Sequence, residues 1–399
     1  MRDRGHHVTL ATNDHFEPLI RAAGVEFVST SKGEEYLETL KDPELWHRTR
    51  GFKAVFQKGV LPLVQPIYQL IAERYVPGKT VVVAHAIALG ARIAQEKLGV
   101  PLATVHLAPA VLRSRTAPPL LPGGEVLQYL PKWLIPEFWR FADRFILDPV
   151  IAPPLNAFRA TLALPPARSI IGDWWMSPQR VIGLFPEWFA PPQQDWPPQL
   201  KLTGFPLFDE GGQQQLSPEL EAFLAAGSLP IAFTFGSAML HAEDLFRESV
   251  KACKQLGRRG LLLTRYPEQL PSDLPAEVLH VPYAPFSALL PKVAALVHHG
   301  GIGTTSQALA AGIPQLVCHL SHDQPDNAQR LKRLGVGDEI SARKYRAARL
   351  AKQLKTLLDN ASTQARCREV AAKFENADTL GATCAIIELL NQTQQQKIQ

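Results

Sequence analysis

The chain has 399 residues, which exceeds one ordinary hydrophobic core and predicts about two domains. Its 46% apolar and 20% charged residues are typical of a globular protein with sizeable cores. The net charge of +5 comes without a dominant basic block, which argues against nucleic acid as a partner but suits an anionic substrate or a weak peripheral contact with a membrane. The four cysteines lack paired spacing, so we expect reduced thiols and a cytoplasmic protein.

The first half alternates short apolar runs with helical patterns. We expect strands over 8–12, 25–28, 80–84 and 102–105, with helices over 15–23, 60–74 and 88–98. This alternation predicts a parallel sheet with helices on both faces. Residues 112–134 are rich in Pro, Leu and Gly without a period, which indicates a surface loop over a cleft.

Aromatic residues are concentrated in the amphipathic helices expected over 136–163. They are Trp139, Phe141, Phe145 and Phe158. We interpret them mainly as core residues, and the alternative is that some line an apolar acceptor pocket.

The second half repeats a strand–glycine–helix order. A strand over 230–235 leads through Gly236 and Ser237 to a helix over 242–255, and Ser237 suits either a ligand contact or a plain helix cap. Further strands are expected over 260–264, 278–281, 293–297 and 315–318, and further helices over 306–311, 341–359, 364–376 and 379–390.

The stretch 293–337 contains the residues that are most typical of a ligand-binding site. A buried strand ends at His298 and His299 and turns through Gly300, Gly301 and Gly303 into a helix whose start holds Thr304 and Thr305. A helix start presents unpaired N–H groups and the positive end of its dipole, and glycines let an anion approach the backbone. This order predicts a phosphate site, although such a turn alone is also consistent with a structural turn.

A polar loop follows the next strand, with Asp323 and Gln324 in it. In an open α/β sheet, ligands lie outside the carboxyl ends of the strands, so this loop should line the same crevice. A carboxylate and an amide suit sugar hydroxyls, which together with the phosphate site suggests a nucleoside diphosphate sugar.

The segments HHGGIGTT, AAGIPQL and DQPDNA closely resemble the donor-binding signature of the UDP-glycosyltransferases, especially the bacterial macrolide and sterol branch. The resemblance runs from Arg4 to about Leu389. It implies the α/β GT-B fold, in which two Rossmann-like doubly wound domains face a cleft. We expect an acceptor domain over 1–206, a nucleotide-sugar domain over 207–376, and a helix and tail over 377–399 that return to the first domain.

The resemblance also implies an inverting hexosyltransferase that needs no cofactor and no essential metal. Its donor site would comprise Ser237, Tyr283, His299, Gly301, Gly303, Thr304, Thr305, Gln307, Asp323 and Gln324. Tyr283 would stack on the base, Gln307 would contact the ribose, and Asp323 with Gln324 would orient the sugar. The acceptor would be a small hydrophobic molecule of the polyketide, terpenoid, sterol or flavonoid kind.

The beginning of the chain departs from this family. Residues 1–7 resemble the end of a helix and 8–12 a second strand, so we expect a first strand and most of a helix to be missing, with the usual catalytic base among them. His85 is the candidate base within this sequence, and His15 and His106 are weaker candidates. Two alternatives stay open, namely a non-catalytic nucleotide-sugar-binding protein and a nucleotide-sugar 2-epimerase.

Overall fold

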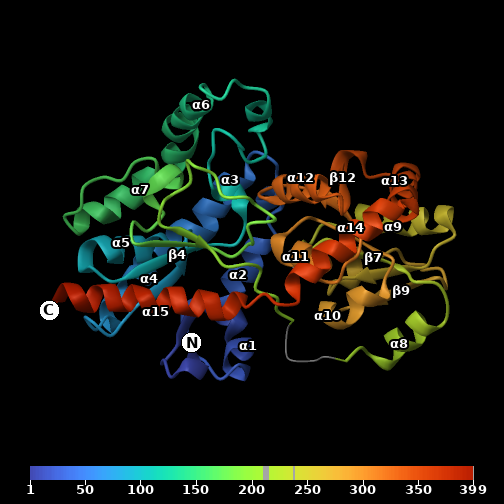
Figure 1. The fold of residues 1–399 in the computed structure, drawn as a ribbon, viewed down its shortest axis with the longest axis horizontal. Helices are drawn as coiled ribbons and strands as arrows, with labels where there is room; N and C mark the ends of the chain where they lie inside the picture. The colour runs from blue at the N-terminus through green and yellow to red at the C-terminus, as the bar shows by residue number, and fades with distance from the viewer. Residues whose placement is uncertain (210–214, 237–238, 399) are drawn as a thin grey trace.

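A computed structural model describes residues 1–209, 215–236 and 239–398, without the side chains of 391–398. Two groups of strands, each surrounded by helices, lie side by side, and the last helix runs along the first group (Figure 1). No described helix is both long and apolar enough to cross a membrane. Within the described residues, no group of three or more His, Cys, Asp or Glu side chains is arranged to hold a metal ion.

The first half contains two separate parallel sheets. One pairs β1 (Thr9–Asn13) with β2 (Glu26–Ser31), and the other has the order β3-β4-β5-β6. The remaining strands are β3 (Val82–His85), β4 (Leu102–His106), β5 (Arg180–Gly183) and β6 (Leu200–Leu202). The helices are α1 (Glu17–Ala22), α2 (Gly33–Leu40), α3 (Gly51–Val55), α4 (Val64–Arg74), α5 (Leu89–Leu98), α6 (Ile135–Ala142) and α7 (Asp148–Thr161).

The second half contains one six-stranded parallel sheet of order β12-β11-β10-β7-β8-β9. Its strands are β7 (Ile231–Thr234), β8 (Gly260–Leu263), β9 (Val278–Val281), β10 (Ala295–His298), β11 (Gln315–His319) and β12 (Gly337–Ser341). Its helices are α8 (Pro218–Ala225), α9 (Glu243–Leu256), α10 (Phe286–Leu289), α11 (Ile302–Ala310), α12 (Gln324–Leu334), α13 (Ala347–Asp359) and α14 (Ala361–Ala371).

The central strands β7, β8 and β10 are buried along their whole length, because helices cover both faces of the sheet. This is why their sequences are continuous apolar runs rather than alternating ones. The chain leaves β7 toward β8 on one side and returns to β10 on the other, so the strand order reverses between β7 and β10. Such a reversal opens a crevice at the carboxyl ends of the two strands.

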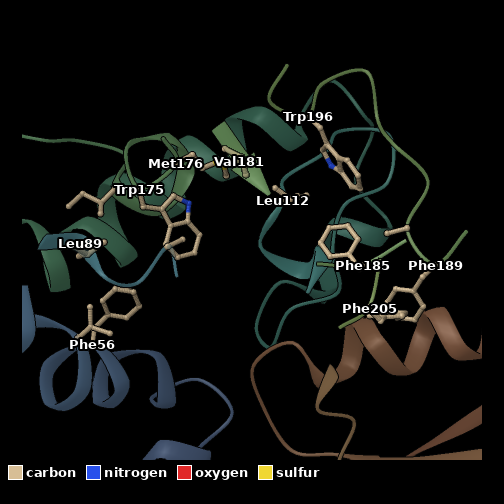
Figure 2. Close-up of a cluster of buried hydrophobic side chains, with 14 of the residues drawn as sticks. Phe56, Leu89, Leu112, Trp175, Met176, Val181, Phe185, Phe189, Trp196 and Phe205 are labelled. Carbon is tan, nitrogen blue, oxygen red and sulfur yellow. The ribbon is translucent and has the colours of Figure 1, made fainter. Parts of the chain in front are cut away.

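The two halves share a hydrophobic core. One cluster joins first-half residues such as Phe189 and Phe205 to Ala328 and Leu331 of α12. Figure 2 shows Phe189 and Phe205 at the edge of this cluster, close to a helix of the second half. The last helix, α15 (Thr379–Ile398), lies along the first half, where Thr383 Oγ1 donates to Thr203 Oγ1 at 2.9 Å.

The interpretation of the α6–α7 aromatics as core residues is wrong for two of them. Phe141 is 55% exposed and Phe145 is 60% exposed, and their rings contact each other at 5.0 Å. Phe158 does pack inward, edge-on to Tyr68 at 5.6 Å, and Trp139 lies beneath the Arg113 guanidinium. These two side chains are exposed because α6 projects from the body of the molecule (Figure 1).

Candidate functional site

The turn after β10 has a shape that requires glycine. Gly300 has a φ of +93°, and a Cβ there would lie 2.6 Å from Cγ1 of Val317. A Cβ on Gly301 would collide with the ring of His299. Larger residues would therefore either strain the backbone or displace the neighbouring strand and the histidine.

Helix α11 begins directly after this turn with Gly301 as its N-cap, and no side chain caps it. The N–H groups of Ile302, Gly303 and Thr304 consequently have no acceptor inside the helix. A Cβ on Gly303 would meet nothing within 4 Å, so there is open space beside this first turn of the helix. The positive end of the helix dipole and N–H groups without an intrahelical acceptor are features that can bind an anion, so this helix start is a candidate anion site.

Two further polar atoms at this turn are buried and have no hydrogen-bond partner within the part of the chain that the structure describes, namely Nδ1 of His299 and Oγ1 of Thr305. Thr305 is fully buried, and burial lowers the pKa of His299 to about 4, so its ring is neutral near pH 7. A buried polar atom without a partner costs free energy that a bound ligand would recover.

The turn after β7 meets the turn after β10. The ring of His299 lies against Gly236, where a Cβ would stand 3.0 Å from it. This contact is at the reversal point of the sheet, as the strand order predicts. Ser237, which follows, lies outside the described residues.

The adjacent His298 has a structural role. Its side chain is fully buried, and Gly300 N donates to its Nδ1 at 3.2 Å, so the proton sits on Nε2 and is donated to Gln315 Oε1 at 3.0 Å. Burial lowers the pKa of His298 to about 3. This ring therefore holds the glycine turn, while the ring of its neighbour His299 lies against Gly301 at the start of α11.

The acidic–amide loop after β11 is internally hydrogen-bonded. Asp323 Oδ2 accepts from Asn327 Nδ2 at 2.8 Å, and burial raises the pKa of Asp323. Asn327 Nδ2 also donates to Gly300 O at 2.9 Å, which joins this loop to the glycine turn. The Gln324 Oε1 accepts from Leu320 N and Ser321 N, leaving its amide nitrogen as the group that could meet a ligand.

The first half contacts this loop at two points that the sequence did not reveal. His322, with a φ of +58°, donates from Nε2 to Leu45 O at 2.9 Å. Asp326 accepts from Leu120 N at 3.0 Å and pairs with Arg330 at 2.7 Å. These partners are hundreds of positions apart in the chain, so no local pattern could have indicated them.

The other predicted donor residues lie nearer the chain segment that joins the halves. Gln307 Nε2 donates to Phe208 O at 2.9 Å. Tyr283 is half-buried, with the Arg265 guanidinium 5.6 Å from the centre of its ring. The structure thus brings together His299, Gly301, Gly303 and Thr305, whereas Gln307 is already engaged by the backbone.

The candidate bases differ sharply in access. His85 lines a cavity at the end of β3, and loss of solvent around its ring lowers its pKa. Ile87 N donates to its Nδ1 at 3.3 Å, so the neutral ring carries its proton on Nε2. His106 is 1% exposed, and burial lowers its pKa to about 3. His15 is exposed, against Phe16 at 5.1 Å.

Solved structures with the same fold are glycosyltransferases. The glycosyltransferase of kitacinnamycin superposes with a TM-score of 0.72 at 18% identity, covering 98% of this chain and 93% of that one. The calicheamicin glycosyltransferase CalG4 gives 0.69 at 16% identity, with coverage of 98% and 92%. VinC in complex with dTDP gives 0.65 at 17%, with coverage of 97% and 94%. The chain therefore has the GT-B fold, and the expected fold class is confirmed.

Sequence comparison identifies the family. Residues 263–381 match the family described as erythromycin biosynthesis protein CIII-like, C-terminal domain. The O-mycaminosyltylonolide 6-deoxyallosyltransferase of Streptomyces fradiae is 30% identical over 412 residues, covering 97% of this chain and 92% of that protein. A sterol 3-beta-glucosyltransferase of Arabidopsis thaliana is 24% identical, covering 96% and 63%. The chain belongs to the EryCIII-like family of glycosyltransferases.

Proposed function

We propose that this protein transfers a hexose from a nucleoside diphosphate sugar, UDP-linked in our preferred assignment, to a hydroxyl of a small hydrophobic acceptor with inversion. The observation that carries the proposal is the start of α11, which no described side chain caps, together with His299 Nδ1 and Thr305 Oγ1, two buried polar atoms that have no partner among the described residues. A diphosphate supplies the negative charge and acceptor oxygens that this arrangement lacks.

The donor would extend in two directions from the diphosphate. Asp323 and the amide nitrogen of Gln324 would take the sugar hydroxyls, and the raised pKa of Asp323 suits a carboxyl that is buried until a hydroxyl reaches it. Tyr283 would stack on the base and Gln307 would face the ribose. In this role Gln307 exchanges its bond to Phe208 O for one to the ligand.

Departure of the nucleoside diphosphate is assisted by the donors at the start of α11, because they bind the charge that develops there. No cofactor or metal is part of this proposal. The acceptor proton needs a base, for which His85 is our candidate. To accept a proton at Nε2, His85 must first release its Nδ1 contact with Ile87 N, since that contact keeps the proton on Nε2.

The domain division that we propose is 1–206 for the acceptor, 207–376 for the donor, and 377–399 for the returning helix and tail. The division is supported by the two sets of sheets and by the packing of α15 on the first half. The acceptor would be polyketide-, terpenoid-, sterol- or flavonoid-like, in keeping with relatives named for tylonolide and sterol substrates.

The same proposal includes a cytoplasmic location and a weak contact with membranes. The four cysteines are free, as expected in a reducing compartment. Exposed Trp133, Phe141 and Phe145 lie near Arg140 and Arg144 in sequence, a combination of aromatic and basic groups that suits an anionic lipid surface.

The decisive experiment is a calorimetric titration with UDP-glucose and dTDP-glucose, followed by mass spectrometry of transfer to pooled macrolide, sterol and phenolic acceptors. We expect binding in the micromolar range and a product one hexose heavier than an acceptor. The variant His85→Asn should bind donor normally but lose turnover, whereas His15→Asn, another exposed histidine of the first half, should retain both.

Two other outcomes would each favour a different function. Donor binding without turnover on any acceptor would support the non-catalytic nucleotide-sugar-binding protein. Conversion of the donor to its 2-epimer, without an acceptor, would support the epimerase. Absence of donor binding would overturn the proposal as a whole.

A further inference from the structure

One segment of the first half, residues 41–46, contacts two loops of the second half. Lys41 O accepts from His241 Nε2 at 3.3 Å. Leu45 O accepts from His322 Nε2 at 2.9 Å. His241 lies in the loop between β7 and α9, and His322 lies in the loop between β11 and α12. The segment therefore bridges loops on both sides of the glycine turn that follows β10, because β10 lies between β7 and β11 in the sheet.

Trp46 adds a second contact with the loop between β11 and α12. Its indole ring meets the ring of His322 edge-on, with 5.9 Å between the ring centres. Trp46 also packs against the hydrophobic core of the second half. A hydrogen bond and an aromatic contact from the first half thus hold the same histidine side chain.

The backbone of His322 has a conformation that most side chains disfavour. Its φ is +58°, and only two other non-glycine residues in the described part of the chain have a positive φ. Histidine enters this left-handed region more readily than most residues, but the conformation still costs free energy and persists only where the surroundings impose it. The bond to Leu45 O and the contact with Trp46 act on this side chain and can impose it.

The conformation of His322 sets where the residue after it lies. Asp323 is the N-cap residue of α12, and Gln324 is the first residue of that helix. On the other side of His322, the N–H groups of Leu320 and Ser321 both donate to Gln324 Oε1. Because both flanks are held in this way, a rotation of the His322 backbone would move Asp323 relative to the glycine turn.

We propose that segment 41–46 of the first half positions the sugar-binding end of the donor site, and that it acts on Asp323 through His322 as a positioning residue. This inference rests on the proposed function, in which Asp323 and Gln324 take the sugar hydroxyls and the start of α11 takes the diphosphate. The phosphate end of the site then belongs to the second half alone, whereas the sugar end depends on the first half. Loss of the contact should weaken the binding of the sugar but not that of the diphosphate.

The experiment compares each nucleotide sugar with the nucleoside diphosphate that lacks the sugar. Calorimetry gives the dissociation constants of UDP-glucose and UDP, and those of dTDP-glucose and dTDP. The first variant is His322→Gly, because glycine adopts the left-handed conformation without strain but has no ring to donate to Leu45 O. We expect the constant for the nucleotide sugar to rise about five- to tenfold, as for one lost hydrogen bond, while that for the nucleoside diphosphate changes less than about twofold.

A second variant, Gly51→Ala, perturbs the first half without altering the second. A Cβ on Gly51 would lie 2.6 Å from Leu45 O, so alanine must displace the carbonyl to which His322 donates. We expect the same selective loss of affinity for the nucleotide sugar. The matched control is Gly59→Ala in the same half, where a Cβ would meet nothing within 4 Å, so both constants should remain those of the wild type.

Replacements of Trp46 test the aromatic contact. Trp46→Phe keeps an aromatic ring that can meet His322, whereas Trp46→Ala removes the ring. We expect Trp46→Phe to bind both ligands as the wild type does, and Trp46→Ala to lose affinity for the nucleotide sugar alone. This rescue by the conservative variant would not be expected if the residue served only the stability of the fold.

The proposed function and this inference fail in different ways. If the wild type binds neither UDP-glucose nor dTDP-glucose, the proposed function fails. If the wild type binds a nucleotide sugar but His322→Gly and Gly51→Ala leave the ratio of the two constants unchanged, only the positioning role is overturned. An equal loss of affinity for both ligands would overturn it as well, because that result would show a structural effect on the whole site. The two substitutions lie in different halves, so the test stands when either variant folds.

Discussion

Replacement of Gly303 by alanine separates the ligand role of the glycine turn from its structural role. A Cβ at this position would meet nothing within 4 Å, and the residue lies in the first turn of α11 without a left-handed φ. Alanine is the better helix former by up to about 1 kcal/mol, so the free energy of unfolding should stay equal or rise.

The substitution is expected to weaken the binding of the sugar donor. The added methyl group projects into the open space beside the first turn of α11, which is the space that a diphosphate would fill. Losing one charge-assisted hydrogen bond costs about 1.5–3 kcal/mol, which corresponds to roughly 10- to 150-fold weaker donor binding. Calorimetry with UDP-glucose and dTDP-glucose measures the binding, and urea unfolding measures the stability.

Gly59 supplies the matched control. It is exposed, lies in the short π-helical turn Phe56–Val60, and would also place a Cβ in empty space. Gly59→Ala should leave donor binding unchanged. If Gly303→Ala binds both donors as tightly as the wild type, the phosphate site is not at this helix start.

Three further predictions test the surroundings of the turn. Thr305→Val removes a buried hydroxyl without a partner, so unfolding free energy should be unchanged or rise by about 1 kcal/mol while donor affinity falls. Burial lowers the pKa of His106 and His298 from 6.5 to about 3 each and that of His299 to about 4, so these three histidines together should destabilise the fold as the pH falls from 6.5 to 4, by up to about 4 kcal/mol per pH unit in urea titrations. Asp326→Asn should cost about 3 kcal/mol of unfolding free energy, because it leaves the buried charge of Arg330 without the opposite charge with which it pairs.

Each of these has its own check. Thr305→Ser, which keeps the hydroxyl, should restore much of the donor affinity. The sign of the acid effect follows because all three folded pKa values lie below the unfolded value, so protons bind the unfolded chain preferentially. His298→Asn should lower the slope by about a third, and an unchanged slope would contradict the assignment. Asp359→Asn breaks an exposed pair with Lys355 and should cost less than about 0.5 kcal/mol, so an equal loss at both positions would refute the burial argument.

Some features of this protein could be predicted because they depend on neighbours in sequence. The continuous apolar run of β10 indicated a buried strand, and that interpretation is confirmed. The glycines after β10 indicated a tight turn into a helix, and Gly300 indeed has a left-handed φ. The resemblance of the 293–337 stretch to glycosyltransferases was confirmed at the level of family and fold.

Other features required the packed structure. The sequence analysis predicted no strand over β12 (Gly337–Ser341), whose polar residues lie at the sheet edge and pair with β11. It also began the next helix at 341, whereas α13 begins at Ala347. The sequence also could not tell that Gln307 bonds to Phe208 O or that Gln324 holds the backbone of its own loop. Both amides are satisfied by groups whose positions depend on how distant segments pack.

The pair His298 and His299 shows what local sequence determines and what depends on tertiary packing. Their position at a strand end, followed by glycines and a helix, was determined by local sequence through backbone sterics and strand and helix periodicity. Only the tertiary structure decided that His298 turns inward to Gln315 while the ring of His299 lies against Gly236 and Gly301. Those outcomes depend on contacts between segments far apart in the chain, which local patterns do not encode.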